Sequence, residues 1–73
     1  MQCVDERAAV NQATQSLNSA KAVVQELEVE FQRATGPQKQ ALRIEIMAAE
    51  KDVAAAQAAL DAANKALQAC LAR

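Results

Sequence analysis

The chain has 73 residues, of which 52% are hydrophobic and 1% aromatic, and a formal net charge of -1. This length allows one small domain, residues 1-73, which buries too little surface to be stable through its core alone and often needs a covalent link or a partner. The near-neutral charge disfavours nucleic acid and anionic membrane surfaces as partners, and the lack of a long apolar stretch excludes a membrane-spanning helix.

The first half of the chain carries a seven-residue repeat of large apolar side chains. Its members are Val10, Leu17, Val24 and Phe31. Extending the repeat towards the N-terminus places Cys3 at the same heptad position, a. Position d is mostly small and holds Glu6, Ala13, Ala20, Leu27 and Ala34. This pattern predicts a coiled-coil helix over residues of about 3-35.

The single glycine and the single proline are adjacent and predict a turn at Thr35-Gly36-Pro37. In one arrangement Gly36 takes the left-handed conformation that ends the first helix, and Pro37 lies in the first turn of the second. In the other, Thr35 and Gln38 form a T-x-x-Q capping box. The sequence does not choose between them.

A second helix is expected over residues of about 37-72, because the seven-residue repeat resumes after the turn. Position a holds Ile46, Val53, Leu60 and Leu67, and position d holds Leu42, Ala49, Ala56, Ala63 and Cys70. The second half therefore repeats the pattern of large a and mostly small d positions.

Folding the chain at the turn brings a positions of one helix opposite d positions of the other, in pairs whose residue numbers sum to 73. Large residues then oppose small ones in nearly every layer, as Leu17 opposes Ala56. The same register brings Cys3 opposite Cys70, although the repeat of large apolar residues sets it without the cysteines. We predict an all-α fold, an antiparallel two-helix coiled-coil hairpin stapled by a disulfide at its open end, with dimerisation into a four-helix bundle as an option.

Two core positions hold charged residues and depart from the pattern. Glu6 opposes Leu67, and Lys39 opposes Ala34. Both layers lie near the ends of the predicted rod, where a long side chain can reach water.

The two cysteines favour a permanent structural disulfide. A redox-active pair is usually C-x-x-C at a helix N-terminus, whereas Cys3 and Cys70 are distant in sequence. Inert thiols and intermolecular bridges remain alternatives. A disulfide implies an oxidising compartment, secreted, periplasmic or lumenal. Because the N-terminus has no signal-peptide pattern, we expect Met1 to be an artificial start on a mature segment.

No catalytic constellation is expected, so the chain is interpreted as a non-enzyme. It has no histidine to act as a general base near neutral pH. Ser16 and Ser19 are interpreted as solvated, and Glu30 and Glu45 as a pair of exposed acids. Two cysteines without histidine predict no metal site, and no cofactor is implied.

A candidate partner surface lies outside the seam between the helices. Alanine occupies every c position of the second helix, and four larger aliphatic residues also lie outside the seam. The candidate surface consists of Val23, Val29, Ile44, Met47, Ala48, Ala55 and Ala62. A smooth alanine face lets another helix approach closely, but alanine is also simply the best helix former on a solvated face. The larger aliphatics favour an interface.

The leading hypothesis is a structural or protein-interaction module that acts through a protein partner or through self-association. The predicted architecture is similar to that of the Rop family of plasmid RNA-binding hairpins, which implies a dimeric nucleic-acid-binding regulator. Against this, the basic residues are spread along the chain, at Arg7, Lys21, Arg33, Lys51 and Lys65.

A second resemblance concerns the alanine-rich stretch of the second helix. Residues 55-63, with the sequence AAQAALDAA, look like the helical hairpins of periplasmic exporter adaptor proteins. This resemblance implies a hairpin segment of a larger periplasmic or phage assembly. Those hairpins are flanked by β-rich domains and do not usually carry a stapling disulfide.

Overall fold

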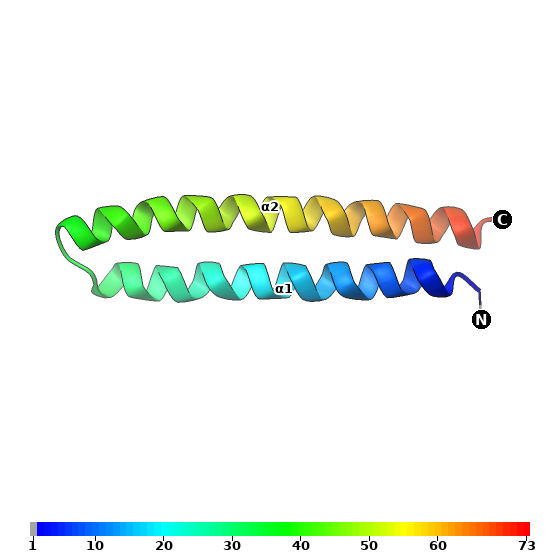
Figure 1. Cartoon of the computed structure of the whole chain (residues 1–73), viewed down its shortest axis with the longest axis horizontal. Helices are drawn as coiled ribbons and strands as arrows, with labels where there is room; N and C mark the ends of the chain where they lie inside the picture. The colour runs from blue at the N-terminus through cyan, green and yellow to red at the C-terminus, as the bar shows by residue number, and fades with distance from the viewer. Residues whose placement is uncertain (1) are drawn as a thin grey trace.

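The computed structural model describes residues 2–73, which form two antiparallel helices joined by a short turn (Figure 1). Helix α1 spans Val4–Arg33 and helix α2 spans Pro37–Leu71. The rod measures 57 × 15 × 12 Å, and both chain ends lie opposite the turn. The predicted all-α helical hairpin is therefore confirmed. The prediction for Met1 lies outside the described residues.

Neither α1 nor α2 combines the length and the apolar character that a helix needs to cross a bilayer.

Both helices begin and end close to the predicted bounds, with the largest difference at the turn. Helix α1 ends at Arg33 and not near residue 35, because Ala34 is extended, with φ −82° and ψ 156°. The Ala34 N–H donates to the Phe31 carbonyl at 3.2 Å and closes the last turn of the helix. Asp5 in the first turn and Arg33 in the last turn carry the charges that the α1 dipole favours.

The position of Gly36 differs from both predicted arrangements of the turn. It precedes α2 as its N-cap, with φ 60° and ψ −136°, and therefore does not end α1 in the left-handed helical conformation. Within this turn no side chain caps α2, so the predicted capping box of Thr35 and Gln38 is wrong. Pro37 occupies the first turn of α2 as predicted, where its missing N–H costs nothing.

The turn gives a first testable prediction. Gly36→Ala should lower the free energy of unfolding by about 1 to 3 kcal/mol, because side-chain-bearing residues rarely adopt this backbone conformation. An added Cβ would meet nothing within 4 Å, so the cost is that of the backbone alone. Urea unfolding followed by circular dichroism measures it.

Thr35→Ala is the matched control for this prediction. It should change the free energy of unfolding by less than about 0.5 kcal/mol, since Thr35 makes no cap. A larger loss of unfolding free energy in Thr35→Ala than in Gly36→Ala would support the capping box instead.

Burial follows the predicted heptads along the full length of the rod. Among residues 2–73, the partly or fully buried side chains fall at a and d positions. In the first half these are Cys3, Glu6, Val10, Ala13, Leu17, Ala20, Val24, Leu27, Phe31 and Ala34. In the second half they are Lys39, Leu42, Ile46, Ala49, Val53, Ala56, Leu60, Ala63, Leu67 and Cys70. The hairpin thus has a core one seam wide, with both outer faces in solvent.

The core side chains are least exposed to solvent in the middle of the rod and near the turn. Leu17 is 5% exposed, Leu42 7% and Ala49 6%, whereas the layers towards the chain ends are only half-buried. The open end therefore has the thinnest packing, and the covalent link lies there.

Lys39, one of the two charged core residues, is accommodated by an aromatic ring. Its Nζ lies 4.7 Å from the centroid of the Phe31 ring, and the Arg43 guanidinium lies 5.7 Å from the same centroid. A cation over an aromatic face is attracted by the ring quadrupole. The single aromatic residue of the chain therefore stabilises the charge that the sequence pattern marked as a departure.

Candidate functional site at the open end

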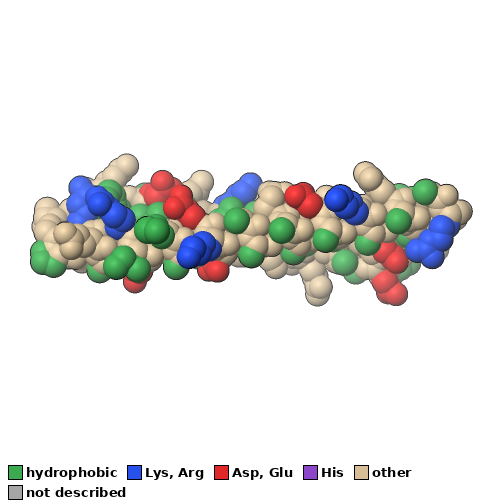
Figure 2. Space-filling model, turned by 90° about the horizontal axis from the view of Figure 1, so that it is seen from above, with side chains coloured by type: hydrophobic (Ala, Val, Ile, Leu, Met, Phe, Trp, Pro, Cys, Tyr) green, Lys and Arg blue, Asp and Glu red, His purple; other side chains and the backbone are tan. Residues whose placement is uncertain are grey.

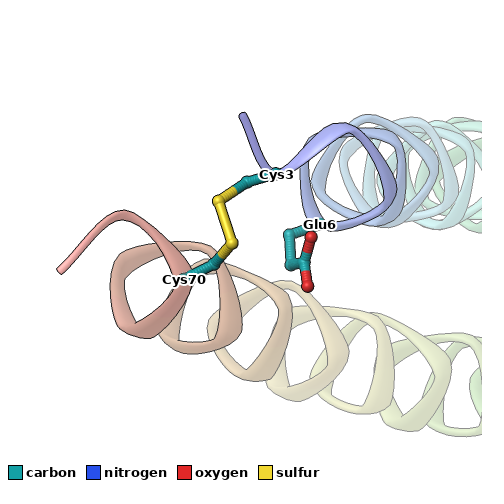
Figure 3. Close-up of side chains that lie close together, drawn as sticks. All are labelled: Cys3, Glu6 and Cys70. Carbon is teal, nitrogen blue, oxygen red and sulfur yellow. A yellow bond between two sulfur atoms is a disulfide. The ribbon is translucent and has the colours of Figure 1, made fainter. Parts of the chain in front are cut away.

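Cys3 and Cys70 form a disulfide that joins the two helices at their free ends (Figure 3). The two residues are separated by 67 positions in sequence, and their Cα atoms lie 6.1 Å apart, within the range that disulfides bridge. The predicted pairing is confirmed, and the chain's two cysteines are both used.

The backbone around Cys3 differs from the predicted helix. Cys3 lies just before α1 as its N-cap, with φ 59° and ψ 42°, in the left-handed region that residues with a Cβ seldom adopt. Its carbonyl accepts a 2.9 Å hydrogen bond from the Arg7 N–H and so begins the helix. Cys70 lies in the last turn of α2, where its carbonyl accepts from the Arg73 N–H at 3.3 Å.

Glu6 completes a three-residue cluster with the cysteines. A carboxylate oxygen of Glu6 and the two Sγ atoms all lie within 4.8 Å of one another, and all three side chains are half-buried (Figure 3). The heptad register assigns Glu6 to the next layer, opposite Leu67, so sequence reasoning treated it only as a core defect. The i, i+3 spacing of Cys3 and Glu6 at a helix start was the signal that could have placed them together.

The four larger aliphatics of the candidate partner surface are exposed but do not form one patch. Val23 is 48% exposed, Val29 50%, Ile44 70% and Met47 57%. Val23 lines a shallow hollow with Asp52, on the flank where the g positions of the two helices meet. Met47 lines another hollow with Arg43, on the e flank. Val29 and Ile44 occupy f positions, on the outer faces of α1 and α2.

The alanines of the candidate surface lie together along α2. Ala48, Ala55 and Ala62 are exposed at successive c positions, on the same flank as Val23. The structure therefore divides the predicted surface into an alanine flank, defined as Val23, Ala48, Ala55 and Ala62, and three separate aliphatic side chains.

Charge is mixed on the face that Figure 2 displays, which is the outward side of α2. Small apolar side chains are dispersed along the whole rod between basic and acidic groups, and neither sign of charge forms a continuous stripe on this face. A groove for a phosphate backbone is built differently, from basic groups gathered along one track.

The polar residues considered for chemistry lie apart from the cysteine cluster. Glu30, Arg33 and Glu45 line a shallow hollow near the turn. Ser16 and Ser19 are exposed on α1.

Comparison with protein-family models, with curated proteins and with solved structures finds no match for this chain. The functional interpretation therefore depends on the open-end cluster and on the exposed helix faces.

Proposed function

We propose that this chain is a non-catalytic coiled-coil module, a rigid rod that presents its helix faces or its turn to a protein partner or to a second copy. The observation that carries the proposal is the burial pattern, in which the a and d positions are covered along the whole length. A helix pair packed in this way holds the side chains of its outer positions in a fixed array.

The disulfide supports the rigid-rod part of the proposal. It links the chain ends where the packing is thinnest and opposes fraying there. A persistent disulfide also favours an oxidising compartment, secreted, periplasmic or lumenal, as the place where the module acts.

The alanine flank supports the interaction part. Small side chains let the backbone of another helix approach closely, and a second hairpin packed there would give a four-helix bundle. The dispersed aliphatics Val29, Ile44 and Met47 would then be accessory contacts or solvated residues.

The first experiment is to measure the mass of the oxidised protein by light scattering, together with its length by small-angle scattering. A dimer or tetramer of rods supports self-association, and a monomeric rod close to 57 Å long supports a foreign protein partner. An expanded, flexible monomer would contradict the proposal, because it would present no fixed face.

Paired variants locate the interface if the protein self-associates. Ala55→Glu, on the alanine flank, should shift the mass towards the monomer, because it buries an unpaired charge in the contact. Ala58→Glu, on the outer face of α2, is the matched control and should leave the mass unchanged. Equal effects of the two variants would exclude the alanine flank.

A nucleic-acid-binding regulator is the competing function, favoured only by the hairpin architecture. A gel-shift titration at low salt, where electrostatic binding is strongest, distinguishes it from a protein-interaction module. We expect no shift with either double-stranded DNA or RNA.

A further inference from the structure

The open end of the rod places three metal-ligating groups from both helices side by side. Cys3 and Glu6 come from the start of α1, and Cys70 comes from the end of α2. Their potential ligand atoms lie within 4.8 Å of one another, and Figure 3 shows the Glu6 carboxylate beside the disulfide. Nothing in the structural role of the disulfide requires this carboxylate.

The geometry points to a second state of this end: once the disulfide is reduced, Cys3, Cys70 and Glu6 bind a thiophilic divalent cation such as Zn²⁺. The cation then joins the same two helix ends that the disulfide joined, so the hairpin is closed in either state.

The chemistry requires a reductant, and a dithiol is the class that supplies it. The dithiol delivers two electrons and two protons, the Cys3–Cys70 bond breaks, and the dithiol leaves as its own disulfide. The two thiols then each release one proton as they bind the cation, since the thiolate is the metal ligand. With the Glu6 carboxylate, three negative charges surround a doubly positive ion.

The distances suit a tetrahedral ion. Zinc binds thiolate sulfur at about 2.3 Å and carboxylate oxygen at about 2.0 to 2.2 Å, so ligand atoms around it lie about 4 Å apart. In the oxidised protein the two Sγ atoms are bonded to each other and a Glu6 carboxylate oxygen lies within 4.8 Å of both, while the Cα atoms of Cys3 and Cys70 are 6.1 Å apart. After reduction, rotation of the two cysteine side chains has to open only the sulfur–sulfur separation to reach the spacing of a zinc site. All three side chains are partly exposed, so water can supply a fourth ligand.

The donor set also selects the kind of cation. Two thiolates favour zinc and other thiophilic ions over Mg²⁺ and Ca²⁺, which prefer oxygen ligands. Asp5, the other acid in the first turn, is exposed and outside the cluster. It therefore serves as a control of equal charge.

The test is a zinc titration of the full chain, reduced and kept under a non-chelating phosphine, in competition with a zinc-binding dye. We expect one Zn²⁺ per chain with release of about two protons at neutral pH. Glu6→Gln should weaken binding by about tenfold or more, because loss of even an outer-shell partner costs that much. Asp5→Asn should bind as the unmodified chain does, and the oxidised protein should show no binding.

A thermal melt followed by circular dichroism provides a second readout, because an ion that binds only the closed hairpin shifts the reduced chain towards the folded state. Excess Zn²⁺ should raise the Tm of the reduced protein, and Glu6→Gln should diminish that rise. With Co²⁺ as the probe, thiolate-to-metal absorption should appear only after reduction, and Cys70→Ser should weaken it. Equal affinities of Glu6→Gln and the unmodified chain, binding to the oxidised form, or one Zn²⁺ shared by two chains would each overturn the assignment.

Discussion

Reducing the Cys3–Cys70 disulfide is expected to lower the free energy of unfolding by about 4 kcal/mol. The bond closes a loop of 67 positions, and the entropy that this loop removes from the unfolded chain is the main source of the effect. Cys3 can relax from its left-handed conformation when the bond is broken, which offsets about 1 kcal/mol. Proteins have total free energies of unfolding of about 0.05 to 0.15 kcal/mol per residue, so the loss on reduction is comparable to the total stability of this chain.

Denaturant unfolding followed by circular dichroism, with and without a phosphine reductant and without added metal, measures the difference. The double variant Cys3→Ser/Cys70→Ser should unfold like the reduced protein and should not respond to reductant. Equal midpoints for the oxidised and reduced protein would mean that the seam alone stabilises the hairpin.

The register of the hairpin was predictable because burial in a two-helix rod is one-dimensional. A repeat of seven residues defines a seam, and the turn at Gly36 fixes which layer opposes which. No other element competes for the same apolar faces. Leu17 and Leu42 are therefore buried where the heptads put them, and the cysteines meet.

The details at the two ends of the rod were not predictable from the repeat. The repeat assigns Cys3 to the helix, but as the N-cap it takes a left-handed conformation. The repeat assigns Glu6 to a separate layer, but its long side chain reaches the sulfurs at the open end. At the turn, two cap patterns overlapped by one residue, and backbone geometry decided for Gly36 as N-cap.

The candidate partner surface shows a different limit of sequence reasoning. Val23 and Met47 were grouped because both are large and lie outside the seam, but position g and position b face opposite flanks of a hairpin. The hollows that they line share no residue with each other. Angular position around the helix, and not exposure alone, decides which residues can meet one partner.

Leu17→Ala should destabilise the hairpin by about 3 kcal/mol, within the range for buried leucine truncations. Leu17 is 5% exposed, and its opposite residue in the register, Ala56, is too small to fill the cavity. Leu60→Ala should cost less, about 2 kcal/mol, since Leu60 is only half-buried. Ile44→Ala is the control: Ile44 is 70% exposed, so the free energy of unfolding should change by less than about 0.5 kcal/mol.

A compensating substitution tests the register itself. In the Leu17→Ala background, Ala56→Leu returns the lost volume to the same layer from the other helix. Stability should then lie within about 1.5 kcal/mol of the unmodified chain, as for volume-conserving exchanges. Ala63→Leu adds the same side chain one heptad away, opposite Val10, and should overpack that layer at a further cost of about 1 to 3 kcal/mol. The urea unfolding midpoints of the two double variants test the register. If both variants regained the same stability, the layers would not pair as the Cys3–Cys70 link implies.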